Sequence, residues 1–195
     1  MDIEGNEIRV NCTGKASLVM DALRGHDTNI PIEEKLYTDD EGYIVMPAQN
    51  IYGFIYAYDR SCIRSYCSVK EYKSISQKAK AAIRVLDEDG NQPDYFYIHD
   101  KNGDRMKWDE KDTERFSIKT GTVKPTPTSP RNLMPPKPLI KAPWKLSFNI
   151  FLIKDSGVTV SELKRWIHHG AAMVGLGTFK PVHGVFNVDI EEIDK

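Results

Sequence analysis

The sequence predicts an α+β fold in which a strand, a helix and a strand follow one another twice. Three observations carry this prediction. Hydrophobic residues alternate with period two in four stretches, and they recur at helical spacing in two others. Asp-Gly and Asn-Gly turns add a β-hairpin insertion after the first helix. The resulting order, βαββαβ, is that of the ferredoxin-like arrangement, with helices on one face of an antiparallel sheet and the other face free to bind.

The first strand and helix are predicted in the N-terminal third. Residues 7–12 alternate as a short strand, and a small apolar run follows at residues 43–46. After Pro47 the period changes, which predicts one helix over about 50–65 with Asn50 as its N-cap. The helical spacing is carried by Ile51, Phe54, Ile55, Tyr58 and Cys62. Aromatic residues at this spacing are interpreted as core and rim rather than as a base-stacking platform.

A β insertion is predicted over about 70–112. Its strands would cover about 81–86, 94–99 and 104–108, joined by the turn sequences DG and NG. The next segment, RFSIKTGTV, alternates with period two and predicts a further strand.

A proline-rich, basic loop is predicted over about 124–143. Seven prolines lie between Pro125 and Pro143. Proline removes backbone donors and fixes φ, so we expect an extended, protruding loop rather than the interior of a sheet.

The C-terminal third predicts a strand, a helix and a strand. WKLSFNIFLI directs Leu146, Phe148, Ile150 and Leu152 to one face. Thr159 and Glu162 form a capping box for a helix that ends near Gly170, and GVFNVDI is the last strand. The apolar stripe of the helix comprises Val160, Leu163, Trp166 and Ile167.

Length and composition indicate one domain over residues 1–195. No run of 18 apolar residues occurs, and the N-terminus lacks the features of a secretory signal, so a cytoplasmic protein without a membrane partner is expected. Cys12, Cys62 and Cys67 form no CxxC pair, which disfavours a disulfide framework and a zinc site.

Charge is distributed unevenly along the chain. Residues 1–114 hold 15 basic and 22 acidic residues (−7), residues 115–188 hold 11 and 2 (+9), and the last seven hold 1 and 4 (−3). This asymmetry predicts an anionic partner for the second half, unless an acidic neighbour in the fold neutralises it.

Several segments resemble the RAMP superfamily of CRISPR-associated RNA-binding proteins. MPAQNIYGFIYAYDR is similar to the start of that family's first helix, and FSIKTGTVKPT with WKLSFNIFLI resembles two strands separated by an extended loop. GAAMVGLGTFKPVHGVFNV resembles the glycine-rich loop between the second helix and the fourth strand. The resemblance implies RNA contacts by Gly175, Gly177, Lys180 and Gly184, and a thumb-like role for residues 125–143.

Catalytic and metal chemistry find little support. The adjacent His168 and His169 diverge on a helix and suit no single metal. The loop GLGTFKPVHG lacks the GK[ST] of a nucleotide-binding loop and precedes a strand. His183 is the one candidate for acid–base catalysis, without a partner residue that spacing can name. The first helix also lacks the histidine that the endonuclease branch of the RAMP superfamily places there, so we expect no enzyme, no metal and no cofactor.

The sequence therefore predicts a single-stranded-RNA-binding protein of a CRISPR-type or phage ribonucleoprotein in antiviral defence. Trp144 or Phe179 could stack on a base, although Trp144 is equally explained as core. Other protein subunits or further copies of the chain are expected as partners. One alternative is an interaction or self-assembly module, such as a phage-encoded factor that docks on a host complex. Another is an RNA endonuclease that uses His183. The predicted RNA-binding residues are Gly175, Gly177, Lys180, Gly184, Lys119, Lys124, Arg131, Lys137 and Lys141.

Overall fold

The computed structural model of the protein describes residues 4–22, 30–123, 128 and 132–193. It has the predicted α+β class, with three antiparallel sheets and four α-helices in these residues. The main sheet has the strand order β4-β8-β1-β9. Its strands are β1 (Gly5–Gly14), β4 (Ile83–Leu86), β8 (Lys145–Ile153) and β9 (Phe186–Ile193).

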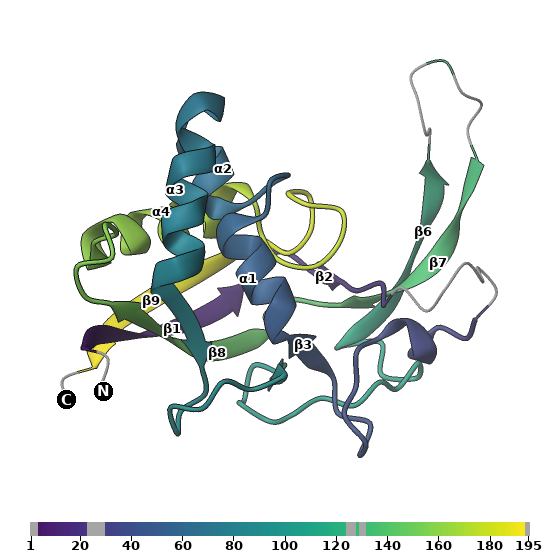
Figure 1. Cartoon of the computed structure of the whole chain (residues 1–195). Coiled ribbons are helices and arrows are strands. Elements are labelled where there is room, and N and C mark those ends of the chain that lie inside the picture. Colours follow the sequence, from purple (N-terminus) through teal and green to yellow (C-terminus); the bar gives the residue numbers. More distant parts are fainter. Residues whose placement is uncertain (1–3, 23–29, 124–127, 129–131, 194–195) are drawn as a thin grey trace.

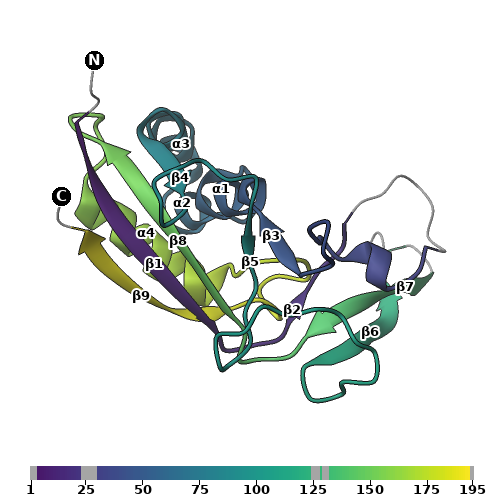
Figure 2. The same cartoon turned by 90° about the horizontal axis from the view of Figure 1, so that it is seen from below.

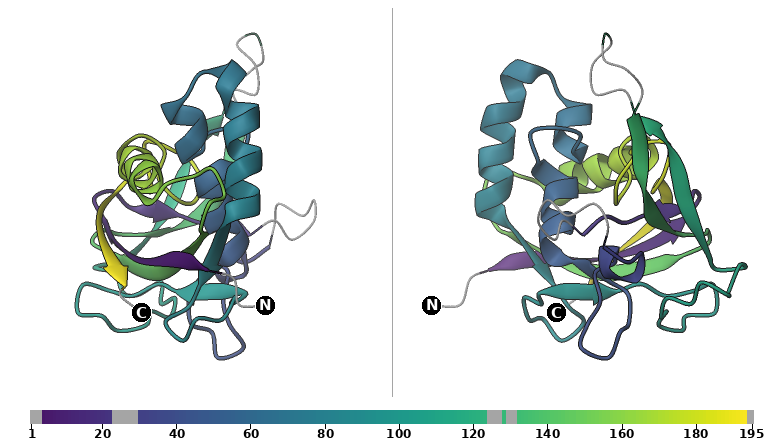
Figure 3. Two further views of the ribbon diagram at one scale, coloured as in Figure 1. Left: turned by 60° about the vertical axis from the view of Figure 1, so that its left-hand side comes forward. Right: turned by 90° about the vertical axis from the view of Figure 1, so that its right-hand side faces the viewer.

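Helices cover one face of the main sheet (Figures 1 and 3). The predicted apolar face of β8 points into this layer, where Leu146, Phe148, Ile150 and Leu152 are each at most 2% exposed. Seen from the other side, the four strands lie next to one another in the order given above (Figure 2). The helices are α1 (Ala48–Tyr56), α2 (Cys62–Tyr66), α3 (Val69–Ala82) and α4 (Val160–Met173).

The single helix predicted over about 50–65 is wrong, because the chain forms two helices there. Ala57 is extended and Arg60 has a φ of +55°, which ends α1 and reverses the chain. The Ser61 hydroxyl then accepts a hydrogen bond from the Arg64 N–H at 3.2 Å and caps α2. The expected N-cap, Asn50, instead lies inside α1.

The predicted β insertion over about 70–112 is wrong in its first part, which is helical. A Ser68–Glu71 capping box starts α3, whose buried side chains are Tyr72, Ser76, Ala79 and Ala82. Small and polar residues on the buried stripe weakened the helical signal in the sequence. The following strand, β4, pairs with β8 and so belongs to the main sheet.

The remainder of the insertion forms strands and turns without a simple hairpin. β5 (Tyr95–Tyr97) pairs with β3 (Val45–Pro47), which precedes it by about 50 residues. The predicted turn at Asp100 is confirmed, since its carboxylate accepts hydrogen bonds from the N–H groups of Asn102, Gly103 and Asp104 at 2.8–3.1 Å.

The proline-rich loop is wrong over residues 132–140, which form a strand. β7 (Asn132–Ile140) is the central strand of a second sheet, between β2 (Leu18–Val19) and β6 (Phe116–Val123). Pro135 and Pro136 lie where the β6–β7 register shifts, and Pro138 takes part through its carbonyl, which accepts from the Met20 N–H at 3.3 Å. β6 and β7 project from the body as an arm (Figure 1).

The C-terminal third has the predicted strand, helix and strand, although α4 runs three residues past Gly170 to Met173 and Val160 is only half-buried. The Thr159–Glu162 capping box starts α4, and Leu163, Trp166 and Ile167 are buried. The carboxyl pKa of Glu162 is lowered, first by the hydrogen bond from the Thr159 backbone N–H and then by that from its hydroxyl. Of the helices in the described part of the chain, none has the length and apolar content needed to cross a bilayer.

Candidate nucleic-acid interface

The glycine loop, residues 174–185, connects α4 to β9 and folds tightly on itself. Gly175, Gly177 and Gly184 have φ values of +77°, +73° and +78°. A Cβ on Gly184 would lie 1.8 Å from the Leu176 carbonyl oxygen, and one on Gly177 would lie 2.4 Å from the Val19 oxygen. These glycines are therefore required by the loop's own packing.

Hydrogen bonds join the glycine loop to the segment after β1. The N–H of Thr178 donates to the Val19 carbonyl at 2.8 Å, and that of Gly184 donates to the Ser17 carbonyl at 2.9 Å. Within the loop, the N–H of Leu176 donates to the Gly184 carbonyl at 2.9 Å. Since these donors are used inside the protein, the loop offers fewer backbone N–H groups to a phosphate than its glycine content indicates.

β2 places the glycine loop beside the arm. Leu18 and Val19 pair with Ile140 and Leu139 of β7, while the Val19 carbonyl receives the loop. Segments about 160 residues apart in the sequence thus meet at one short strand, as Figure 1 shows for the yellow loop next to β2.

Lys119 and Lys137 of the arm face the glycine loop. They are cross-strand partners, and the Lys137 ammonium lies 5.7 Å from the centre of the Phe179 ring. Lys137 also forms an ion pair with Asp21, and burial lowers the pKa of its ammonium. Lys137 therefore joins the arm to the loop and is less available to a ligand than an exposed lysine.

Lys180 lies half-buried at the outer side of the loop. Its pKa is lowered, mainly by burial, and its carbonyl oxygen accepts a hydrogen bond from Arg60 at 3.0 Å. A depression of about 810 Å³ is bordered by Lys180, Arg60 and Arg64, together with the exposed ring of Tyr58. The turn between α1 and α2 thereby contributes Arg60 and the Tyr58 ring to this surface, and α2 contributes Arg64.

Other predicted site residues are not brought to this surface. Lys141 directly follows β7, and its ammonium donates to the Thr113 carbonyl instead. Trp144 is fully buried, with its indole N–H on the Ala16 carbonyl at 2.9 Å, so it cannot stack on a base. Lys124 and Arg131 lie outside the described residues.

His183, in the glycine loop, lies near Lys119 of the arm. Its Nε2 is buried and makes no hydrogen bond to the described residues. Burial, and then the nearby Lys119, lower its pKa below the usual value of 6.5. Among the described residues, no group of three His, Cys, Asp or Glu side chains could hold a metal ion.

Arg60, Arg64 and Tyr58 were missed as site residues by the sequence reasoning. The usable signal was Ser61, because a serine after a helical run marks the start of another helix. A break at that point exposes Tyr58 and Arg60, which lie just before it, and places Arg64 in the first turn of the next helix.

The fold resembles that of one chain in a solved RNA-bound complex. No family model matches the sequence, and no curated protein is similar to it. A chain in the cryo-EM structure of the Type III-B Cmr-beta bound to cognate target RNA matches over 97% of this protein with a TM-score of 0.59 and 15% identity. The match covers 61% of that chain, so this protein spans about three fifths of its length. At this identity, the similarity is one of fold.

Proposed function

We propose that the protein binds single-stranded RNA, without catalysis, as a RAMP-like component of a CRISPR-type ribonucleoprotein. The observation that carries the proposal is that the glycine loop is bordered by cationic side chains from two directions, Arg60 and Arg64 on one side and Lys119 of the arm on the other. Such a role would place the protein in the cytoplasm, with RNA and other protein subunits or copies of itself as partners.

The proposal includes a ferredoxin-like core. If β1, β4, β8 and β9 are numbered 1 to 4 along the chain, their order across the main sheet is 2-3-1-4. All neighbouring pairs are antiparallel. α1 to α3 connect the first pair of strands and α4 connects the last pair. This order is consistent with a split βαβ arrangement elaborated by two extra helices.

Charge and shape favour a single strand. Arg60, Arg64, Lys119 and Lys180 border the loop and can attract phosphates, while the exposed Tyr58 ring offers a stacking surface for an unpaired base. The similarity to a chain of an RNA-bound complex supports the same reading. The buried Nε2 of His183 argues against acid–base catalysis, because a catalytic nitrogen must reach its substrate.

The triple variant R60A/R64A/K180A tests this proposal. We expect its affinity for a 20-nucleotide single-stranded RNA to fall at least about tenfold in 100 mM salt, and the slope of log K against log salt to decrease by about 2. Fluorescence anisotropy over a salt series measures both quantities.

The matched control is K70A/K73A/K111A, which removes the same charge from exposed lysines elsewhere. Equal losses in the two variants would show that only net charge matters and would contradict a site at the glycine loop. Circular dichroism establishes that both variants are folded.

A further inference from the structure

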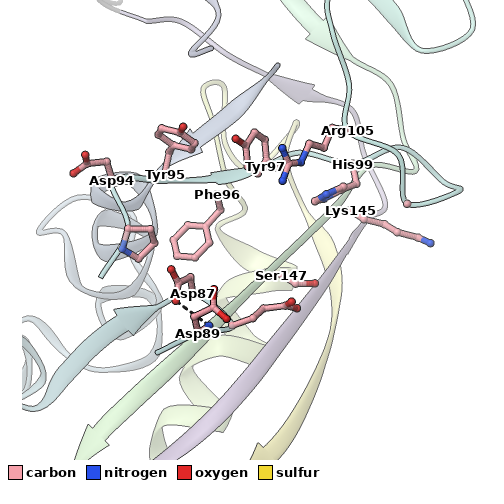
Figure 4. Close-up of a pocket in the computed structure, with 13 residues that line it drawn as sticks. Asp87, Asp89, Asp94, Tyr95, Phe96, Tyr97, His99, Arg105, Lys145 and Ser147 are labelled. Carbon is pink, nitrogen blue, oxygen red and sulfur yellow. Dashed lines mark hydrogen bonds between the residues drawn. The ribbon is translucent and has the colours of Figure 1, made fainter. Parts of the chain in front are cut away.

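A second cleft lies between β5 and β8, formed by other elements than the glycine loop. It has a volume of about 780 Å³. Figure 4 shows Phe96 pointing from β5 toward the turn that holds Asp87 and Asp89, with Arg105 beside Tyr97. We call it the β5 cleft; it is lined by Asp87, Glu88, Asp89, Pro93, Asp94, Tyr95, Phe96, Tyr97, His99, Gly103, Arg105, Lys145 and Ser147.

The cleft opens where two paired strands separate. His99 and Lys145 exchange two backbone hydrogen bonds, of 2.9 and 2.8 Å. Continued pairing would bring Tyr97 opposite Ser147. Instead, both residues line the cleft. β8 and β5 therefore separate beyond the His99–Lys145 pair.

The backbone of β5 therefore has one edge directed into the cleft. On the β3 side, hydrogen bonds are made by Asp94, whose carbonyl accepts from Ala48 at 2.8 Å, and by Ile98, whose N–H donates to Ile44 at 3.0 Å. Because backbone groups alternate in direction along a strand, those of Tyr95 and Tyr97 point to the opposite side. Tyr95 is exposed and Tyr97 is half-buried, which leaves Tyr95 as the more open of the two positions.

One wall of the cleft is acidic and fixed in place. The Asp87 carboxylate accepts hydrogen bonds from the N–H groups of Asp89 and Asn91 at 3.0 and 2.8 Å. The buried Asn149 side chain of β8 donates to the Asp87 carbonyl at 3.2 Å. This turn holds the exposed carboxylate of Asp89 near the mouth of the cleft, and Asp94 is exposed on β5's side.

The opposite end is cationic. The Arg105 guanidinium lies over the Tyr97 ring, 3.5 Å from its centre, and Lys145 and His99 lie beside it. Four carboxylates and two permanent cations line the cleft, which gives −4 + 2 = −2. A phosphate chain is repelled by such a surface, whereas a protein segment carrying a basic side chain is attracted.

We propose that the β5 cleft binds an extended segment of a partner protein by strand addition to β5. The segment's backbone pairs with Tyr95 and Tyr97, one of its lysines or arginines contacts Asp89 and Asp94, and an acidic group farther along contacts Arg105 and Lys145. The ring of Phe96 forms the apolar floor. This site does not depend on RNA binding at the glycine loop.

Selection from a displayed library of random decapeptides tests the proposal. We expect peptides enriched on the wild-type protein to contain lysine or arginine and to bind the charge-reversed variant D89K/D94K at least about tenfold more weakly. The control D40K/E110K reverses two exposed carboxylates elsewhere and should bind as the wild type does. Hydrogen exchange measured by NMR should slow at the amides of Tyr95 and Tyr97 when peptide is bound.

Three results would overturn the proposal: a library without binders, equal binding to D89K/D94K and wild type, or bound peptide without slower exchange at Tyr95. A single-stranded RNA that slows exchange at Tyr95 would make the cleft a nucleic-acid site instead. RNA binding by R60A/R64A/K180A is a separate measurement, so failure of either proposal leaves the other intact.

Discussion

Single residues in the glycine loop determine its shape more than they expose it to a ligand. Gly184 and Gly42 have nearly the same φ, +78° and +82°, but only Gly184 is enclosed. A Cβ at Gly184 would meet the Leu176 oxygen at 1.8 Å, whereas one at Gly42 would have no atom of the described residues within 4 Å. Alanine substitutions at Gly42 and Gly184 therefore distinguish the cost of a left-handed backbone from the cost of steric crowding.

We expect Gly42→Ala to lower the free energy of unfolding by about 1–2 kcal/mol, the cost of a left-handed alanine. Gly184→Ala should lower it by more than about 3 kcal/mol, since crowding is added to the same strain. Urea unfolding measures both values. Equal losses would mean that the loop can open to accept a methyl group, and thus that it is not held as described.

The reactive side chains of the loop illustrate what spacing alone leaves undecided. The sequence predicts Lys180 as an RNA contact and His183 as a catalytic candidate, and in the structure burial lowers the pKa of both. Position in a loop does not reveal burial, because the contacts that cover these side chains come from β6 and from the α1–α2 turn, far away in the sequence.

At the level of elements, α2 and α4 approach closely because Gly170 lies at their contact. A Cβ on Gly170 would lie 2.2 Å from the Cys62 sulfur. The thiol of Cys62 is fully buried there, which raises its pKa well above the usual value. Two helices from the two halves of the fold thus share one tightly packed contact.

Gly170→Ala should lower the free energy of unfolding by about 1–3 kcal/mol, although alanine is the better helix former by about 1 kcal/mol. In a Cys62→Ala background, the same change should cost at least about 1 kcal/mol less, because the sulfur is gone. Gly53→Ala in α1, with open space around it, should be neutral or stabilising. Additive effects of the Gly170 and Cys62 changes in thermal unfolding would contradict the contact.

Elements were predicted well where their side chains have a strong, regular pattern. β8, α4 and its capping box follow from large apolar residues at fixed spacing. α3 was missed because alanine and serine form its buried stripe, and β7 was missed because its prolines argue against a central strand. In β7 the register shift accommodates Pro135 and Pro136, and Pro138 takes part through its carbonyl oxygen. These arrangements depend on pairing with β6 and on the neighbouring Met20, which a local pattern does not record.

For the whole molecule, the arm can be separated from the core. Lys119 and Lys137 are cross-strand partners in the arm. The core residues of these two strands, Phe116 and Ile140, lie nearer the base of the arm than this lysine pair does. Replacing residues 120–136 with Asn-Gly should therefore leave a closed hairpin. We expect the free energy of unfolding to fall by less than about 2 kcal/mol, chiefly through loss of the buried Met134.

The same variant lacks the predicted RNA-binding residues Lys124 and Arg131 and should therefore bind single-stranded RNA at least about tenfold more weakly. A peptide selected on the β5 cleft should bind unchanged. Anisotropy with each labelled ligand measures both affinities. RNA affinity equal to that of the wild type would show that the arm beyond Lys119 and Lys137 takes no part in binding.

The sequence by itself determined the α+β class, the strand–helix–strand order of the C-terminal third, the capping box at Thr159 and the glycine-rich loop between α4 and β9. These features depend on neighbours within a few residues, and local patterns record them. Tertiary structure alone decided that the loop meets the arm at β2, that Lys137 is paired with Asp21, and that Arg60 and Arg64 join Lys180. Those contacts join residues more than 100 positions apart, and their geometry arises only when the chain packs around one core.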